Sequence, residues 1–207
     1  MCASTSKWYA LWLLLFLNTL AGIAVISQEA PIFQELVGVT AVVAASMVGI
    51  ASIGNAVGRV FWAWVSDSIT RRLTFLVMLL IQVLLFWLLA NSSMIAGTTL
   101  LTFVVLMCYG GGFGTMPAFA ADYFGSKNVG PIYGLMLTAW GTASAVGPLL
   151  IAYLRQTTGS YHRPLHVIAI VMAVSALLPL VMFAPGPRTR KEPEVSEQQT
   201  TARSKAA

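Results

Sequence analysis

The sequence predicts an all-α membrane protein that crosses the bilayer six times. Hydrophobic residues make up 57% of the 207 residues and charged residues only 9%, whereas a soluble domain is about 25% charged. The mean hydropathy is accordingly high, at +0.79. A hydrocarbon core of ~30 Å needs about 20 apolar residues in a helix, and six such runs lie at residues 8–27, 40–64, 73–91, 95–116, 131–154 and 164–184.

The first run, residues 8–27, is predicted to be a transmembrane helix rather than a cleaved signal peptide. Only Lys7 precedes it, which would also suit a signal peptide. However, the apolar part of a signal peptide has roughly 7–15 residues and ends at a cleavage site between small residues. This run is longer and no such site follows it cleanly. Residues 1–7 are therefore expected to form a short cytoplasmic N-terminus.

The second run carries a polar stripe. Ser52, Asn55, Arg59 and Trp62 recur three or four residues apart, which is the spacing of one helix face. An arginine at the bilayer centre costs roughly 2.5–3.5 kcal/mol on insertion scales, so something should be gained in return. Arg59 precedes Asp67 at the inner end by eight residues, about 12 Å of helix, which is a long reach to the head groups.

Two interpretations of Arg59 are open at this point. The side chain either snorkels or forms a fixed ion pair, or it lines a cavity and binds an anionic substrate. A carboxylate suits the second interpretation, because the planar guanidinium offers two parallel donors and the bound anion neutralises the buried charge. We expect Arg59 to be the anion site, with Asn55 as a weaker contributor.

Small residues mark three of the runs. GNAVG at residues 54–58 is a G-x-x-x-G motif, which lets two helix backbones approach closely. The fourth run contains YGGGFGTMP and the fifth contains YGLMLTAWGTASAVGP, with small residues at helical spacing. Such faces are usually packing devices. Three of them in one bundle, two with glycine near proline, also predict helices that bend or slide during alternating access.

Two aromatic residues of the fifth run are further candidates for the substrate path. Tyr133 and Trp140 are seven residues apart and therefore share a helix face. Tryptophan is equally common as a bulky packing residue. No Asp, Glu or His lies well inside any run, because Glu29 and Glu35 fall near the predicted outer ends. We therefore expect this bundle to supply no proton-binding site of its own.

The distribution of basic residues predicts the orientation. Cytoplasmic loops of membrane proteins carry an excess of Lys and Arg. A six-span chain places two cations, Arg155 and Arg163, on one side and nine on the other. The richer side, with both termini, is predicted to be cytoplasmic at the cell membrane. Its nine cations are Lys7, Arg71, Arg72, Lys127, Arg188, Arg190, Lys191, Arg203 and Lys205.

Composition also argues against several other classes of protein. The net charge of +5 is spread between apolar runs and the tail, without the basic stripe of a nucleic-acid-binding protein. Cys2 and Cys108 lie far apart and suggest neither a disulfide framework nor a metal site. No nucleophile–base pair supports an enzyme, and no cofactor is expected. Residues 185–207 have the composition of a disordered cytoplasmic tail, which leaves residues 8–184 as the membrane domain.

The turn after the second run resembles a motif of the major facilitator superfamily. WAWVSDSITRR places Asp67, Arg71 and Arg72 as in the G-x-x-x-D-x-x-G-R-R loop of those transporters, with Ala63 and Thr70 at the two glycine positions. In the family this loop makes charge contacts that hold the inward side closed. A plain cytoplasmic anchor is the alternative, and the missing glycines put their tight-packing role in doubt.

Longer stretches resemble the second half of the oxalate/formate antiporter family. They are FLNTLAGIAVISQEAPIFQEL, GNAVGRVFWAWVSDSITRR, MPAFAADYFGSKNVGPIYGLMLTAWG and AVGP. The resemblance implies half of a twelve-helix fold and the transport of small carboxylates such as oxalate, formate or lactate. In the oxalate-exchanging branch a second cation lies in the penultimate helix, where residues 131–154 have no Lys or Arg. A monocarboxylate is therefore favoured over a dianion.

Six spans suggest two roles for the chain. It is expected to be a half or truncated transporter that works with a first-half polypeptide or by self-association. Alternatively, it is a membrane interaction module that has lost transport and binds a full-length transporter.

Overall fold

The computed structural model describes residues 6–182, and this part of the chain is helical apart from short connections. It contains six spans that are long and apolar enough to cross a membrane, which confirms the predicted fold class. The predicted tail at 185–207 and residues 1–5 lie outside the described residues. The helices are α1 (Ser6–Val37), α2 (Ala41–Ser68), α3 (Arg71–Ala90), α4 (Ile95–Phe124), α5 (Val129–Met136), α6 (Thr138–Thr158), α7 (His162–Ser175) and α8 (Leu177–Val181), with a 3₁₀ turn η2 (Ser126–Asn128) before α5.

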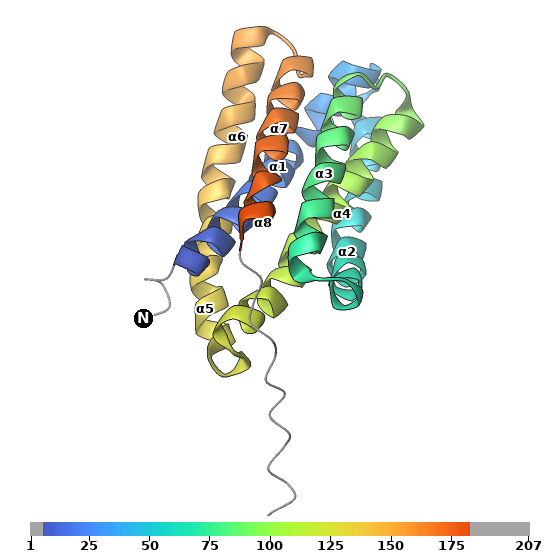
Figure 1. Ribbon diagram of the computed structural model, residues 1–207. Coiled ribbons are helices and arrows are strands. Elements are labelled where there is room, and N and C mark those ends of the chain that lie inside the picture. Colours follow the sequence, from blue (N-terminus) through green and yellow to red (C-terminus); the bar gives the residue numbers. More distant parts are fainter. Residues whose placement is uncertain (1–5, 183–207) are drawn as a thin grey trace, which may run out of the picture.

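The bundle has two groups of helices that meet at its centre. Figure 1 shows α1, α6 and α7 on one side and α2, α3 and α4 on the other. The closest pairings are α2 with α4, α1 with α6, and α3 with α7, while α1 also packs on α4. Large side chains such as Phe75, Phe86 and Phe119 are fully buried between these helices. The core therefore lies around α1, α3 and α4.

Several helices extend beyond the apolar runs, and this corrects the predicted loops. The predicted runs leave residues 65–72 and 117–130 as connections. The first connection is only Ile69 and Thr70, and the second is helical as far as Phe124. Hydropathy marks the ~30 Å hydrocarbon core, whereas a helix of 30 residues is about 45 Å long. The ends of the long helices thus continue past the apolar segment that the sequence reveals.

The first helix is broken where the predicted run ends. Within α1, Gln28 leaves the helical region with φ −127° and ψ 16°, and Pro31 follows inside the helix. Proline has no N–H to donate to the preceding turn, so a kink near it is expected. The fifth and sixth spans are also interrupted, at Leu137 and Ala176, although both residues keep right-handed helical angles.

Two of the spans are much less covered than the others. In the most apolar window of α2, and in that of α5 with α6, only 28% of the residues are buried, against 44% to 61% in the other four spans. These two spans carry the four residues that the sequence singles out as substrate-binding candidates. Their open faces must meet lipid or another polypeptide.

Candidate functional site

The glycine motif of α2 packs directly on α4. A Cβ atom added to Gly54 would collide with the carbonyl oxygen of Phe103, and one added to Gly58 would collide with that of Met107. A backbone contact this close is possible only because the α2 residue at each contact has no side chain. The prediction that GNAVG brings two helix backbones together is therefore confirmed.

A second pair of glycines, on α4, packs against the backbone of α2. Added Cβ atoms at Gly110 and Gly114 would collide with the backbone carbonyl oxygens of Asn55 and Arg59. The two G-x-x-x-G motifs thus interlock, and the α4 backbone holds the backbone of Arg59 in place. A rigid backbone at this point fixes the position from which the Arg59 side chain extends.

Arg59 is exposed on the surface of the bundle and has an aromatic neighbour. Its Cζ atom lies 5.6 Å from the centroid of the Phe113 ring, a cation–π distance. The ion pairs in the described part of the chain involve Arg71 and Arg155, so Arg59 has no acidic partner within residues 6–182. This argues against a fixed ion pair inside the bundle and leaves the donors of Arg59 available.

Three more aromatic side chains surround this arginine. Tyr109 packs edge-on against Phe113 with ring centroids 5.2 Å apart, and Trp140 of α6 donates from Nε1 to the Tyr109 hydroxyl at 3.1 Å. The charge of Arg59 acts on the hydroxyls of both Tyr109 and Tyr133. The structure thus brings Arg59, Tyr133 and Trp140 to one region, which spans α2, α4, α5 and α6.

Sequence reasoning missed Tyr109 and Phe113. They are the first and last residues of YGGGF in the fourth run, where the three glycines between them suggested packing alone. A four-residue spacing of two aromatics on one helix face was the available signal. It becomes meaningful only once α2 is known to lie against this part of α4.

The polar stripe of α2 is narrower than the sequence predicted. Ser52 and Arg59 are exposed, whereas Trp62 is buried with its ring against Gly111. The assignment of Trp62 to an accessible stripe is therefore wrong, because the glycines of α4 leave room for its indole inside the bundle. Asn55 is intermediate: its Oδ1 atom is buried without a hydrogen-bond partner and lies close to Gly110.

The loop motif lies at the end of the bundle that the sequence predicts to be cytoplasmic, called the inner end here, and it connects several helix ends. Arg71 pairs with Asp67 at 2.5 Å and approaches Asp122 of α4 at 3.5 Å between Nε and Oδ2. Arg72 donates to the carbonyl oxygens of Leu180 and Met182 at 3.0 and 2.9 Å. The motif therefore connects the inner ends of α2, α3 and α4 to the end of α8.

One departure from the family motif has a structural role. Thr70, which stands at the second glycine position, caps the N-terminus of α3 by accepting a hydrogen bond from the backbone N–H of Leu73 at 3.3 Å. A threonine in this position satisfies one of the free donors at a helix start. The short turn is thus fixed by a cap in place of a flexible glycine.

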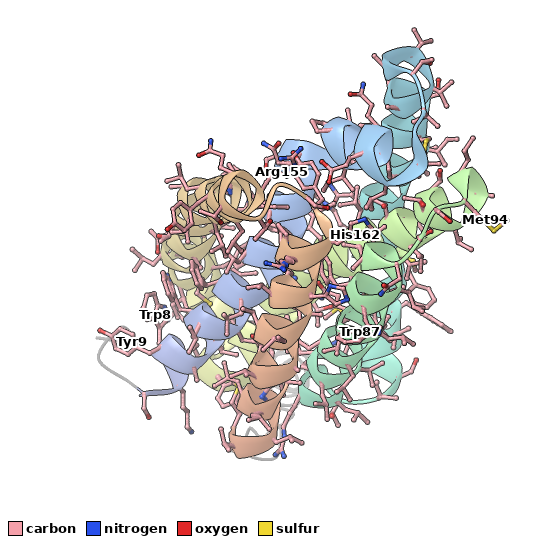
Figure 2. All side chains as sticks on the ribbon, turned by 90° about the horizontal axis from the view of Figure 1, so that it is seen from above. Trp8, Tyr9, Trp87, Met94, Arg155 and His162 are labelled. Atoms are coloured by element: carbon pink, nitrogen blue, oxygen red, sulfur yellow. The ribbon has the colours of Figure 1, made fainter. Side chains whose placement is uncertain are left out.

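A second charged cluster fixes the opposite end of the bundle, which the sequence predicts to face outward and which is called the outer end here. Arg155 of α6 donates to Glu35 of α1 at 2.8 Å, and Glu35 also accepts from the backbone N–H of Tyr161 at 2.7 Å. Figure 2, seen from above, shows Arg155 beside the outer part of α1. Burial raises the pKa of the Tyr161 hydroxyl, which stays protonated and donates to Gln28 Oε1 at 2.8 Å. Arg155, the one cation of α5 and α6, is therefore already paired.

Comparison with known proteins shows that the chain is similar to membrane transporters. The sequence profile of the Major Facilitator Superfamily matches residues 6–206. The chain is 30% identical over 149 residues to the sialic acid transporter NanX of Escherichia coli (strain K12), a match that covers 70% of this chain and 36% of the relative. It is 26% identical over 145 residues to the oxalate:formate antiporter of Oxalobacter formigenes, which covers 69% of this chain and 34% of the relative. The chain thus matches about a third of the length of each relative.

Proposed function

This chain belongs to the major facilitator superfamily, and from that premise we propose that it takes part in transporting a small carboxylate anion by alternating access. It is a multi-pass membrane protein whose relatives are transporters and not enzymes. In the proposed role, Arg59 binds the carboxylate, Tyr133 and Trp140 line the path beside it, and Asn55 contributes from the edge of the α2–α4 contact.

The observation that carries this proposal is the state of Arg59. It is exposed on the bundle surface, it lies over an aromatic ring at 5.6 Å, and no acid among the described residues neutralises it. A guanidinium in a low-dielectric site is stabilised by an anion that accepts two parallel hydrogen bonds. Substrate and arginine would therefore stabilise each other, with the Tyr109 and Tyr133 hydroxyls as further donors.

A monocarboxylate such as formate or lactate is the favoured substrate over oxalate. Two negative charges in a bilayer need two cations or an equivalent set of donors. The spans α5 and α6 offer only Arg155, which is engaged by Glu35 at the outer end. Of the cations on α2, α5 and α6, only Arg59 is outside the ion pairs, and one such cation matches one carboxylate.

We further propose that the bundle is the second half of a transporter and that a first-half polypeptide covers its open faces. Arg59 on α2 and Thr138, Gly141 and Thr142 on α6 are exposed, and polar groups facing lipid are costly. A substrate site between two bundles is the usual arrangement in transporters built from repeats. Self-association would cover the same faces with a second copy of this chain, and co-expression followed by cross-linking distinguishes the two.

A second candidate function uses the same open faces. If the chain binds a full-length transporter without moving substrate, it should co-purify with that transporter and add no uptake. If it is half of a carrier, uptake should appear only when a first-half polypeptide is present. Comparing uptake by vesicles that contain the chain alone with uptake by vesicles that contain the pair separates these functions.

The proposed site is tested by substitution of Arg59. Arg59→Lys should weaken the binding of formate or lactate about tenfold, which is ~1.4 kcal/mol, because an ammonium lacks the planar pair of donors. Arg59→Gln should abolish ligand-dependent stabilisation of the purified chain in thermal unfolding, and should abolish carboxylate transport by the assembled pair. Arg155→Gln is the matched control and should retain both.

The outcomes separate the two interpretations of Arg59. Normal transport by Arg59→Gln would remove the anion site from the proposal. Loss of folding without a separable binding defect would show that the arginine has a structural role instead.

We propose that both termini face the cytoplasm at the plasma membrane, as the basic residues predict. The chain has two cysteines, and Cys108 is fully buried, so a membrane-impermeant thiol reagent should report on Cys2. We expect no labelling in intact cells and labelling after lysis. Labelling of Cys2 in intact cells would reverse the orientation, and Cys2→Ser controls for reaction at Cys108.

A further inference from the structure

Glu29, which the sequence places near the outer end of the first span, has its side chain buried inside the protein. The side chain is only 3% exposed. Glu35, six residues further along α1, marks the outer level through its ion pair with Arg155. Six residues are about 9 Å of helix, so Glu29 lies about that much deeper along α1. The sequence placed both glutamates at the interface because the apolar run ends before them.

The helix is broken at this position. Gln28 has non-helical backbone angles and Pro31 follows within the same turn. Because proline has no N–H, the Ser27 carbonyl lacks its usual helical donor. The outer part of α1 then leans toward α2, where Phe33 packs with Ala44 and Met47, and Figure 2 shows this segment diverging from the rest of the helix. Glu29 therefore lies at the kink and in the protein interior.

No ion pair among residues 6–182 includes Glu29. Its Oε1 atom has no hydrogen-bond partner in this part of the chain. Of the titratable or charged groups at the outer end, Arg155 and Tyr161 bind Glu35 and Gln28, and His162 contacts the Ala90 carbonyl. The others, Tyr153, Arg163 and His166, are on α6 and α7.

The remaining neighbours of α1 offer no counter-charge at this level. The outer half of α2, residues 41–58, and that of α4, residues 95–107, contain no titratable or charged residue. A carboxylate ion out of water needs donors or a cation, and without them the penalty is several kcal/mol. A protonated carboxyl group has no such requirement. These surroundings therefore favour the protonated form of Glu29 over the carboxylate while the side chain is buried.

We propose that Glu29 is a proton-binding site of this transporter, protonated in the conformation described and deprotonated when the α1 kink opens to water. The step is the transfer of one proton from water to one carboxylate oxygen, and it needs no other reactant. A further consequence rests on the proposed carboxylate function: one proton on Glu29 with one monocarboxylate on Arg59 would move together without net charge.

Infrared spectroscopy of the purified chain in detergent tests the site without any transport assay. A protonated carboxyl group gives a carbonyl stretching band, distinct from the bands of a carboxylate, that shifts in heavy water. We expect such a band at neutral pH, lost in Glu29→Gln and kept in the matched control Glu35→Gln. Absence of the band, or its survival in Glu29→Gln, would overturn the proposal. If Glu29→Gln does not fold, Glu29→Asp should move the band in place of removing it, and an unmoved band would likewise overturn the proposal.

Transport then tests the use of this proton. In vesicles containing the assembled pair, Glu29→Gln should abolish the dependence of uptake on a pH gradient while exchange continues. A pH-gradient dependence that survives Glu29→Gln would overturn the coupling role, while the infrared result would still decide the site. Failure of the carboxylate proposal appears separately, as unchanged ligand binding in Arg59→Gln.

Discussion

The two glycine-bearing faces of this molecule look alike in sequence and behave oppositely in the structure. On α2 and α4, Gly54, Gly58, Gly110 and Gly114 press against opposing backbone. On α5 and α6, Gly134 and Gly141 have no atom within 4 Å of an added Cβ. Glycine spacing therefore shows that a helix is able to approach a neighbour closely, but not whether that neighbour is part of the same bundle.

The packed face and the open face have different consequences for the molecule. The α2–α4 contact holds the backbone from which Arg59 projects, so its glycines position the residue that we propose to bind the substrate. The α5–α6 face carries small and polar residues that remain uncovered, so its glycines are free to serve a contact with another polypeptide. Arg59 lies between the two regions, with its backbone in the first and its side chain directed toward the aromatic residues shared with the second.

The largest expected effect comes from adding one carbon atom to the packed face. Gly58→Ala should lower the free energy of unfolding by about 3 kcal/mol, because the new Cβ meets the Met107 backbone and the helices must separate. Denaturant unfolding in detergent micelles measures this. Gly134→Ala is the control on the open face and should change stability by less than about 0.5 kcal/mol. Equal effects of the two substitutions would remove the distinction between the faces.

An intermediate effect is expected from tryptophans on the two faces. Trp62→Ala should cost about 2–3 kcal/mol of stability, because a buried ring is lost and packing is the main force between helices in lipid. Trp140→Ala removes an exposed ring and one hydrogen bond to Tyr109, which should cost at most about 1 kcal/mol. Thermal unfolding compares the two variants. A larger loss for Trp140→Ala would mean that α6 is anchored more firmly than its exposure indicates.

The smallest effect on stability should accompany a large effect on association. Gly141→Leu fills open space and should leave the unfolding of the isolated chain within about 0.5 kcal/mol of the unchanged protein. If this face meets a first-half polypeptide, the bulky side chain should reduce co-purification with that partner strongly. Leu84→Ala, at an exposed position of α3 outside the faces proposed to be covered, is the control and should leave co-purification unchanged. Unchanged co-purification of the Gly141 variant would place the partner elsewhere.

Several features were predictable because they depend on the bilayer as solvent. The six spans follow from run length and hydropathy, and the close approach at GNAVG follows from the absence of side chains. The charged motif of Asp67 and Arg71 does form a pair. These features are local, since each depends on residues within one helix or one turn.

Other features depended on which helices become neighbours. Tyr109 and Phe113 join the candidate site only because α4 lies against α2, and Trp62 leaves the accessible stripe because Gly111 makes space for it. Periodicity shows that residues share a helix face. It does not show whether that face meets protein, lipid or a cavity.

By itself the sequence determined the all-α class, the number of spans and the unusual presence of Arg59, because the bilayer imposes length and polarity on each helix separately. Only the tertiary structure decided that Arg59 has no acidic partner in the described bundle, that one glycine face is packed and the other open, and that Glu29 is buried. Those outcomes depend on the pairing of helices and on the kink at Gln28, which bring together residues far apart in the chain. The physical reason is that hydropathy acts residue by residue, whereas burial and charge compensation are properties of neighbours in space.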